Sequence, residues 1–139
     1  MSKALTSTVI GIEVPFQDVD PMQVVWHGNY LRYFEAARAA LLRKIDYDYP
    51  QMLASHYLWP IIEARVRFIQ PLRYGQRIQV SAALVEWENR MKIDYLVTDA
   101  ANGKRHTKGY TIQCAVDVRS QELQMVSPPA LLERLKDYL

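Results

Sequence analysis

Several features that particular protein classes depend on are scarce or missing in this sequence. It has one cysteine, Cys114, so no disulfide can form within the chain. It has no run of about 18 apolar residues, which argues against a transmembrane helix. No apolar segment follows Lys3 near the start, so we expect no signal peptide and a cytoplasmic location. The formal net charge of +2 is too balanced for nucleic acid to be the main partner.

The composition that remains is that of an ordinary soluble globular protein, with 50% hydrophobic and 23% charged residues. A chain of 139 residues can build a single core, and no internal repeat occurs, so one domain is predicted over 1–139. Alternation of apolar and polar residues predicts strands, and Asn102-Gly103 and 88–90 predict tight turns between them. The predicted strands are 6–17, 59–71, 76–87, 91–99 and 105–118.

The longest predicted helix begins near Asn29 and continues past Leu42. Its residues are apolar on nearly every face, which is typical of a buried helix. One strand, this helix and four further antiparallel strands predict an α+β fold whose sheet curls around the helix and buries it on all sides. Two shorter helical segments are predicted at 51–56 and after Pro128-Pro129. The apolar side of the last one would carry Leu131, Leu132, Leu135 and Leu139.

The start of the central helix combines features of an anion-binding site. A helix that begins near His27 presents free backbone N–H groups and the positive end of its dipole, which can hold a polarised carbonyl oxygen. Gly28 has no side chain to keep a ligand away from that backbone. Asp20 lies seven residues before His27, and Pro21 favours a turn there. These residues predict an oxyanion site with a base or nucleophile beside it.

Three stretches of the sequence resemble the signature of a known enzyme family. They are Asp18-Val19-Asp20-Pro21, Val24-Val25-Trp26-His27-Gly28-Asn29-Tyr30 and Phe34-Glu35-Ala36-Ala37-Arg38. The resemblance is to the hotdog-fold acyl-CoA thioesterases of the 4-hydroxybenzoyl-CoA thioesterase type, including the thioesterase associated with the Tol-Pal system, and it covers most of the chain. Residues 20–30 and 85–90 also resemble, more weakly, thioesterases found among fatty-acid-like and aryl-polyene biosynthesis enzymes.

The resemblance implies a fold, a reaction and an assembly. The fold would be a five-stranded antiparallel sheet wrapped around a long central helix. The reaction would be hydrolysis of an acyl-CoA or acyl carrier protein thioester to free acid and thiol, with no cofactor beyond the coenzyme A or phosphopantetheine of the substrate. Asp20 would be the catalytic carboxylate, as nucleophile or general base, and the His27 N–H would polarise the thioester carbonyl. The active site would lie at a subunit interface of a homodimer or homotetramer.

The other residues of this region could contact substrate or have a structural role. Trp26, Gly28, Asn29 and Tyr30 are expected to contact substrate, although Asn29 and Tyr30 could equally cap and pack the helix start. The aromatic rings of Trp26 and Tyr30, with Tyr57 and Trp59, could line an acyl pocket or belong to the core.

Neighbouring positions are read as structural. Asp18 is expected to bond loop backbone, and Glu35 and Arg38 are expected to pair with each other on the buried helix. No metal is expected, because His56 and His106 have no third ligand at metal spacing. Cys114 reads as a small core residue.

One position departs from the resembling family, which usually has glycine where this chain has Gln23. Such a glycine would serve tight backbone geometry or pocket space. Two rival functions stay open. One is dehydration of a hydroxyacyl thioester on the same fold, and the other is non-catalytic acyl binding with a pocket altered by Gln23.

Basic residues along the strands, such as Arg65, Arg67 and Lys108, either form solvated strand faces or hold coenzyme A phosphates or an acidic carrier protein.

Overall fold

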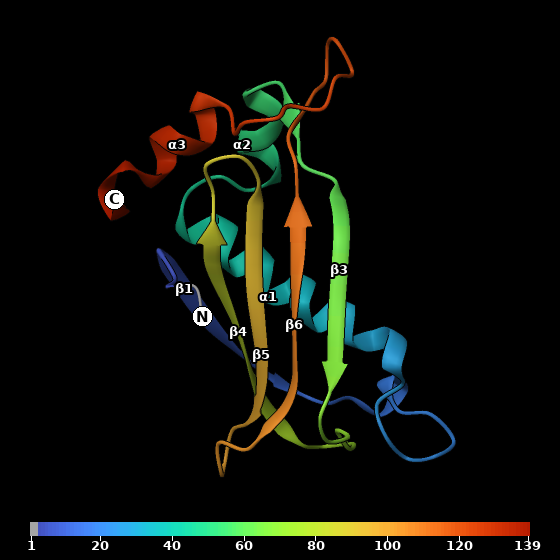
Figure 1. The fold of residues 1–139 in the computed structure, drawn as a ribbon. Coiled ribbons are helices and arrows are strands. Elements are labelled where there is room, and N and C mark those ends of the chain that lie inside the picture. Colours follow the sequence, from blue (N-terminus) through green and yellow to red (C-terminus); the bar gives the residue numbers. More distant parts are fainter. Residues whose placement is uncertain (1–2) are drawn as a thin grey trace.

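The computed structural model describes residues 3–139 as one antiparallel sheet with a long helix across one face (Figure 1). The sheet has five strands in the order β1-β4-β5-β6-β3, and all neighbours are antiparallel. The first two residues of the predicted 1–139 domain lie outside the described part. The strands are β1 Thr6–Glu13, β3 Ile61–Phe68, β4 Arg77–Glu86, β5 Met91–Asp99 and β6 Arg105–Gln113.

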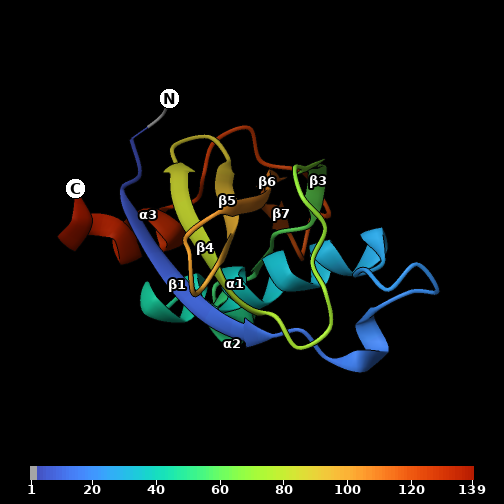
Figure 2. The ribbon, with the colours of Figure 1, turned by 90° about the horizontal axis from the view of Figure 1, so that it is seen from below.

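The central helix, α1 (Tyr30–Lys44), buries one face against this sheet. Its buried positions recur at helical spacing, as in Tyr33, Phe34, Ala37 and Leu41. The Phe34 ring stacks on Tyr95 of β5 with centroids 4.5 Å apart. These contacts fix the helix across the strands, as seen along the sheet in Figure 2.

The prediction that α1 is buried on all sides is wrong for the single chain. Leu31, Glu35 and Ala36 are exposed on its outer face. The sheet covers one side of the helix, and among residues 3–139 no second layer covers the other. The apolar pattern was correct, but it included a surface that this chain does not bury by itself.

The edge strand β3 has the predicted alternation without the expected burial. Ile62 and Phe68 are about half exposed, at 52% and 53%, and Val66 is partly buried. By contrast, β4 and β5 alternate regularly between buried and more accessible residues. The apolar side of β3 is therefore free surface in one chain.

Both predicted hairpin turns are confirmed. Residues 88–90 join β4 to β5, and the segment with Asn102-Gly103 joins β5 to β6. Gly103 has φ +71°, a conformation that glycine adopts without strain. The predicted strands 76–87 and 91–99 match closely, and 59–71 is shortened to Ile61–Phe68. The predicted strand 105–118 is too long, because β6 ends at Gln113 and Val116–Asp117 form a separate strand that pairs with Tyr57–Leu58. The first ends at Glu13, because Pro15 introduces the 3-10 turn η1 (Phe16–Asp18) in place of a strand through residue 17.

The remaining elements cover one end of the sheet. Helix α2 (Tyr49–Ala54) begins two residues before the predicted 51–56, because Asp48 and Gln51 form a capping box at its start. Strands β2 (Tyr57–Leu58) and β7 (Val116–Asp117) pair beside it. The C-terminal helix α3 (Pro129–Leu135), followed by the 3-10 turn η3 (Lys136–Tyr138), buries Leu131 and Leu135 as predicted. Leu139 is exposed, which corrects its assignment to the apolar side.

Candidate active site

Asp20 opens a tight turn that brings residues 19 and 25 together. Val19 and Val25 form an antiparallel bridge. The Asp20 N–H donates to the Val24 carbonyl at 2.9 Å. The half-buried Asp20 carboxylate accepts the Met22 N–H at Oδ1, 2.8 Å away, which is its one hydrogen bond within residues 3–139. The second carboxylate oxygen is thus available to a ligand.

Asp18 has a structural role, as predicted, although it acts through its carboxylate as well as its backbone. Its buried carboxylate accepts two hydrogen bonds from the Arg32 guanidinium at 2.7 and 2.8 Å and one from the Tyr33 hydroxyl at 2.7 Å. Burial, and then the bond to Asp18, raise the pKa of the Tyr33 phenol. Asp18 therefore ties the turn to the first part of α1, and Arg32 pairs with it rather than with Glu35.

The helix start has free N–H groups beside this turn. The 3-10 turn η2 (His27–Asn29) leads directly into α1. The N–H groups of Trp26 and Asn29 donate to the carbonyls of Asp18 and Trp26, at 3.0 and 2.9 Å. Within the described residues, no acceptor is recorded for the N–H groups of His27 and Gly28, as expected for the first positions of a helix.

Gly28 is required by the ring of Trp26. A Cβ atom at Gly28 would lie 2.2 Å from the indole, closer than real contacts allow. The Trp26 ring is half exposed and lies 5.0 Å from the exposed His27 ring. Trp26, His27 and Gly28 thus form one surface at the helix start, where an acyl thioester could approach the backbone.

Asn29 and Tyr30 have packing roles in the single chain. The Asn29 side chain donates to the Asp18 carbonyl at 2.9 Å. Tyr30 is buried, with its ring 5.0 Å from that of Phe68, and burial raises the pKa of its phenol. Substrate contact by these two residues stays a prediction.

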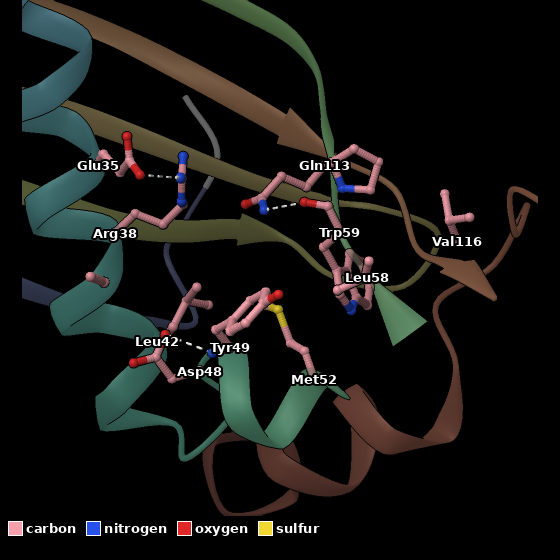
Figure 3. Close-up of a pocket in the computed structure, with 12 residues that line it drawn as sticks. Glu35, Arg38, Leu42, Asp48, Tyr49, Met52, Leu58, Trp59, Gln113 and Val116 are labelled. Atoms are coloured by element: carbon pink, nitrogen blue, oxygen red, sulfur yellow. Dashed lines mark hydrogen bonds and ion pairs between the residues drawn. The ribbon is translucent and has the colours of Figure 1, made fainter. Parts of the chain in front are cut away.

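A cavity that the sequence did not predict lies at the other end of α1 (Figure 3). It has a volume of about 590 Å³ and is bounded by α1, α2, β2, residues 59–60 just before β3, the end of β6 and Val116 of β7. Glu35 and Arg38 lie on its α1 side, and Gln113 reaches in from β6. Two sequence features pointed to residues of this cavity, the Glu35–Arg38 spacing and the expectation that Trp59 could line an acyl pocket. Gln113 was not anticipated, because it is 75 residues away from Arg38 in the chain and the sheet register brings it there.

No group of three or more His, Cys, Asp and Glu side chains within 3–139 is arranged to hold a metal ion. None of the helices in this part of the chain is long and apolar enough to cross a membrane. Cys114 is buried in the sheet region, in line with the core prediction.

Comparison with known proteins identifies the family and the fold of this chain. The profile of the thioesterase-like superfamily matches residues 14–135. The chain belongs to this superfamily. An Aquifex aeolicus relative, provisionally named an esterase, is 32% identical over 128 residues, which cover 89% of this chain and 94% of that protein. The predicted hotdog fold is confirmed by a 1,4-dihydroxy-2-naphthoyl-CoA thioesterase from Synechocystis, with a TM-score of 0.83, 16% identity and coverage of 95% and 97% of the two chains.

A second protein similar to this chain has a more specific name. A Bacillus subtilis protein provisionally named an acyl-CoA thioesterase is 34% identical over 65 residues. The match covers 47% of this chain and 47% of that protein, so the chain matches about half of the relative's length.

The backbone at Gln23 suits the glycine that the resemblance leads us to expect at this position. Gln23 has φ +66°, in the left-handed region, and its N–H donates to the Asp20 carbonyl at 2.8 Å. Glycine adopts this conformation freely, whereas other residues are strained in it. This conformation agrees with the backbone role considered for such a glycine, and the exposed Gln23 side chain is not part of the lining of the cavity beside α1.

Proposed function

We propose that the protein hydrolyses acyl-CoA thioesters. The observation that carries this proposal is the pair of free N–H groups at His27 and Gly28 beside the accessible carboxylate of Asp20. Such N–H groups stabilise an oxyanion, and a carboxylate can attack a carbonyl or activate water. Membership in the thioesterase-like superfamily and the name of the Bacillus relative support the same reaction.

The residues suggest how the bond would break. The thioester carbonyl oxygen would accept a hydrogen bond from the His27 N–H. In one route Asp20 attacks the carbonyl carbon, the thiolate leaves, and water hydrolyses the resulting mixed anhydride to acid and free Asp20. In the other, Asp20 takes a proton from a water that attacks directly, and the proton passes to the departing thiolate. Both routes need Asp20 as a carboxylate.

We propose that the active unit is a homodimer joined along β3. An exposed edge strand with apolar side chains invites pairing with a second strand, and a two-fold axis lets each copy cover the other. Ile62 and Phe68 provide the apolar contact. The turn that carries Asp20 projects beyond this edge of the sheet in both views (Figure 1, Figure 2), so it would lie against the partner. Two such dimers could form the homotetramer that is the larger predicted assembly.

The thiol carrier could be coenzyme A or an acyl carrier protein. The face of the sheet opposite α1 has a hollow of about 430 Å³ with Arg65, Arg67, Lys92, Arg105 and Lys108 around it. Cations in this arrangement suit either phosphates or the acidic surface of a carrier protein. We propose coenzyme A thioesters as substrates and keep carrier-protein thioesters as a second candidate.

Thiol release tests the proposal. Wild type and Asp20→Asn are compared on aryl, short, medium and long acyl-CoA and on acyl carrier protein thioesters, with Asp137→Asn as a surface control. We expect wild type and control to release thiol, and Asp20→Asn to lose at least about 100-fold in rate. If no thioester is cleaved, or Asp20→Asn matches wild type, the proposal fails. Water loss from a hydroxyacyl thioester, or retention of acyl-CoA without turnover, would then favour the dehydratase or the binding protein.

A further inference from the structure

The cavity at the far end of α1 contains a buried hydrogen-bond acceptor without a donor. Gln113 is 4% exposed, and its Nε2 donates to the Trp59 carbonyl at 2.7 Å. Its Oε1 has no partner among the described residues. Figure 3 shows the amide reaching from β6 toward Arg38 on α1. A buried unpaired acceptor is unfavourable unless a water molecule or a ligand supplies the donor, and a ligand group in the cavity could do so.

Arg38 is a buried donor that is only weakly paired. Its side chain is 14% exposed, and the one ion pair that it forms within residues 3–139 is with Glu35 at 3.9 Å, beyond hydrogen-bond distance. Burial raises the pKa of the Tyr95 phenol and the nearby Arg38 guanidinium opposes this rise, so Arg38 also faces that hydroxyl. The Glu35 side chain is 68% exposed, so water screens this pair. The guanidinium therefore has donors left for a group inside the cavity.

The rest of the cavity wall is mainly apolar. A lining of hydrophobic side chains with a few converging polar groups is the usual character of a small-molecule site. The polar lining residues are Glu35, Arg38, Asp48, Tyr49 and Gln113. Arg38 and Gln113 are the least exposed of these, and they supply a donor and an acceptor. The apolar lining includes Leu42, Met52, Leu58, Trp59 and Val116.

A hydroxyl group fits this pair, because it accepts from Arg38 while donating to Gln113. A carboxylate fits less well, since the Gln113 oxygen and the Glu35 carboxylate would both repel it. An unsubstituted alkyl or aryl group would leave the Gln113 oxygen unpaired.

The cavity faces the thioester site of the partner if the dimer forms along β3. Within one chain, Arg38 lies 11 residues after His27, which is about 16 Å along the helix and too far for a short acyl group. Tyr30 contacts Phe68, so the helix start lies at the Phe68 end of β3, whereas Trp59 and Pro60 place the cavity at the Ile61 end. A two-fold axis through the middle of β3 brings these opposite ends together.

We infer that Arg38 and Gln113 select an acyl group with an apolar body and a distal hydroxyl, held in this cavity while Asp20 and His27 of the other subunit act on its thioester. This inference rests on the proposed hydrolysis and dimer. It assigns substrate preference to Arg38, which ends the third signature stretch, and to Gln113, which lies outside all three stretches.

Matched substrate pairs test the preference. The probes are 4-hydroxybenzoyl-CoA with benzoyl-CoA, and 6-hydroxyhexanoyl-CoA with hexanoyl-CoA. We expect wild type to favour the hydroxyl member of at least one pair by about tenfold or more in kcat/KM. Arg38→Met and Gln113→Met should lower kcat/KM for the hydroxyl member more than for the unsubstituted member, so that most of that preference is lost. Arg119→Met and Gln79→Met, which change exposed residues away from the cavity, should behave as wild type.

Measuring how tightly each thioester binds distinguishes a failure of this inference from a failure of the proposed hydrolysis. Calorimetry with Asp20→Asn measures the dissociation constant of each uncleaved thioester, and we expect tighter binding of the hydroxyl member. Equal binding of both members together with equal rates in wild type would overturn the inference while leaving hydrolysis intact. Equal losses on both members in folded Arg38→Met and Gln113→Met would overturn it as well.

A mixed dimer tests the placement across the interface. Asp20→Asn and Arg38→Met chains with different tags are co-expressed, and the heterodimer is purified. One of its two sites would combine intact Asp20 with the intact Arg38 of the other chain, so the hydroxyl preference should return. A heterodimer that retains the weak preference of Arg38→Met would overturn the cross-subunit assignment.

Discussion

At the scale of single residues, two carboxylates one residue apart have different surroundings. Asp18 is buried and bonded to Arg32 and Tyr33, whereas Asp20 keeps one oxygen free. We expect Asp18→Asn to lower the free energy of unfolding by about 1 to 3 kcal/mol, because the buried amide pairs poorly with Arg32, which is itself 58% exposed to water. Urea denaturation measures this. Asp20→Asn should stay within about 1 kcal/mol of wild type, and the reverse order would contradict these roles.

Gln23 is a second residue whose effect should be local. Its left-handed backbone is strained, so Gln23→Gly should raise the free energy of unfolding by up to about 1 kcal/mol, after the extra chain entropy of glycine is allowed for. Gln17→Gly, at an exposed position outside the left-handed region, serves as the matched control and should be neutral or destabilising. A loss of stability in Gln23→Gly would show that the turn does not strain residue 23.

The sequence was informative about residues whose neighbours are close in the chain. Asp20, His27 and Gly28 lie within nine residues, so a turn followed by a helix start was enough to group them. Arg38 and Gln113 meet only through the register of β6 against β5 and the packing of α1 on the sheet. Short-range patterns carry no information about such a meeting, and the cavity could not be predicted.

At the scale of elements, the β5–β6 hairpin carries a titratable carboxylate. Asp99 accepts from Gln76 Nε2 at 2.8 Å and from the Ala101 N–H at 2.7 Å, and these bonds lower the pKa of Asp99. A lowered pKa in the folded state means that Asp99 stabilises the protein above its unfolded pKa and that this contribution is lost as pH falls toward the folded pKa. Asp99→Asn should therefore lower Tm at pH 7 and differ less from wild type near pH 3. An equal difference at both pH values would contradict this.

The element that was least well predicted from sequence is α1. Its apolar residues correctly indicated a helix with a buried face, and Gly109 on β6 lets the Phe34 ring lie directly on the sheet. The same pattern included Leu31 and Ala36, which are exposed in one chain. Apolar periodicity indicates that a helix surface is buried, but it does not indicate whether the same chain or another chain buries it.

At the scale of the whole molecule, α1 and β3 leave apolar residues exposed. The turn that carries Asp20 projects beyond the β3 edge of the sheet (Figure 1). A dimer along β3 would cover the strand edge and place each turn against the other copy. Ala64 is exposed near the middle of β3, close to the expected two-fold axis. Ala64→Lys would place two like charges opposite each other there, which opposes edge pairing.

We expect Ala64→Lys to be a folded monomer, because the side chain is exposed in the single chain and the sheet does not need it. Light scattering coupled to size exclusion measures the mass, and circular dichroism measures the fold. Thiol release should fall at least about tenfold if both chains build each site. Ala101→Lys, at the exposed tip of the β5–β6 hairpin, is the matched control and should keep both dimer and activity. A folded monomer with undiminished activity would mean that Asp20, His27 and the acyl pocket work within one chain, and the shared site would have to be abandoned.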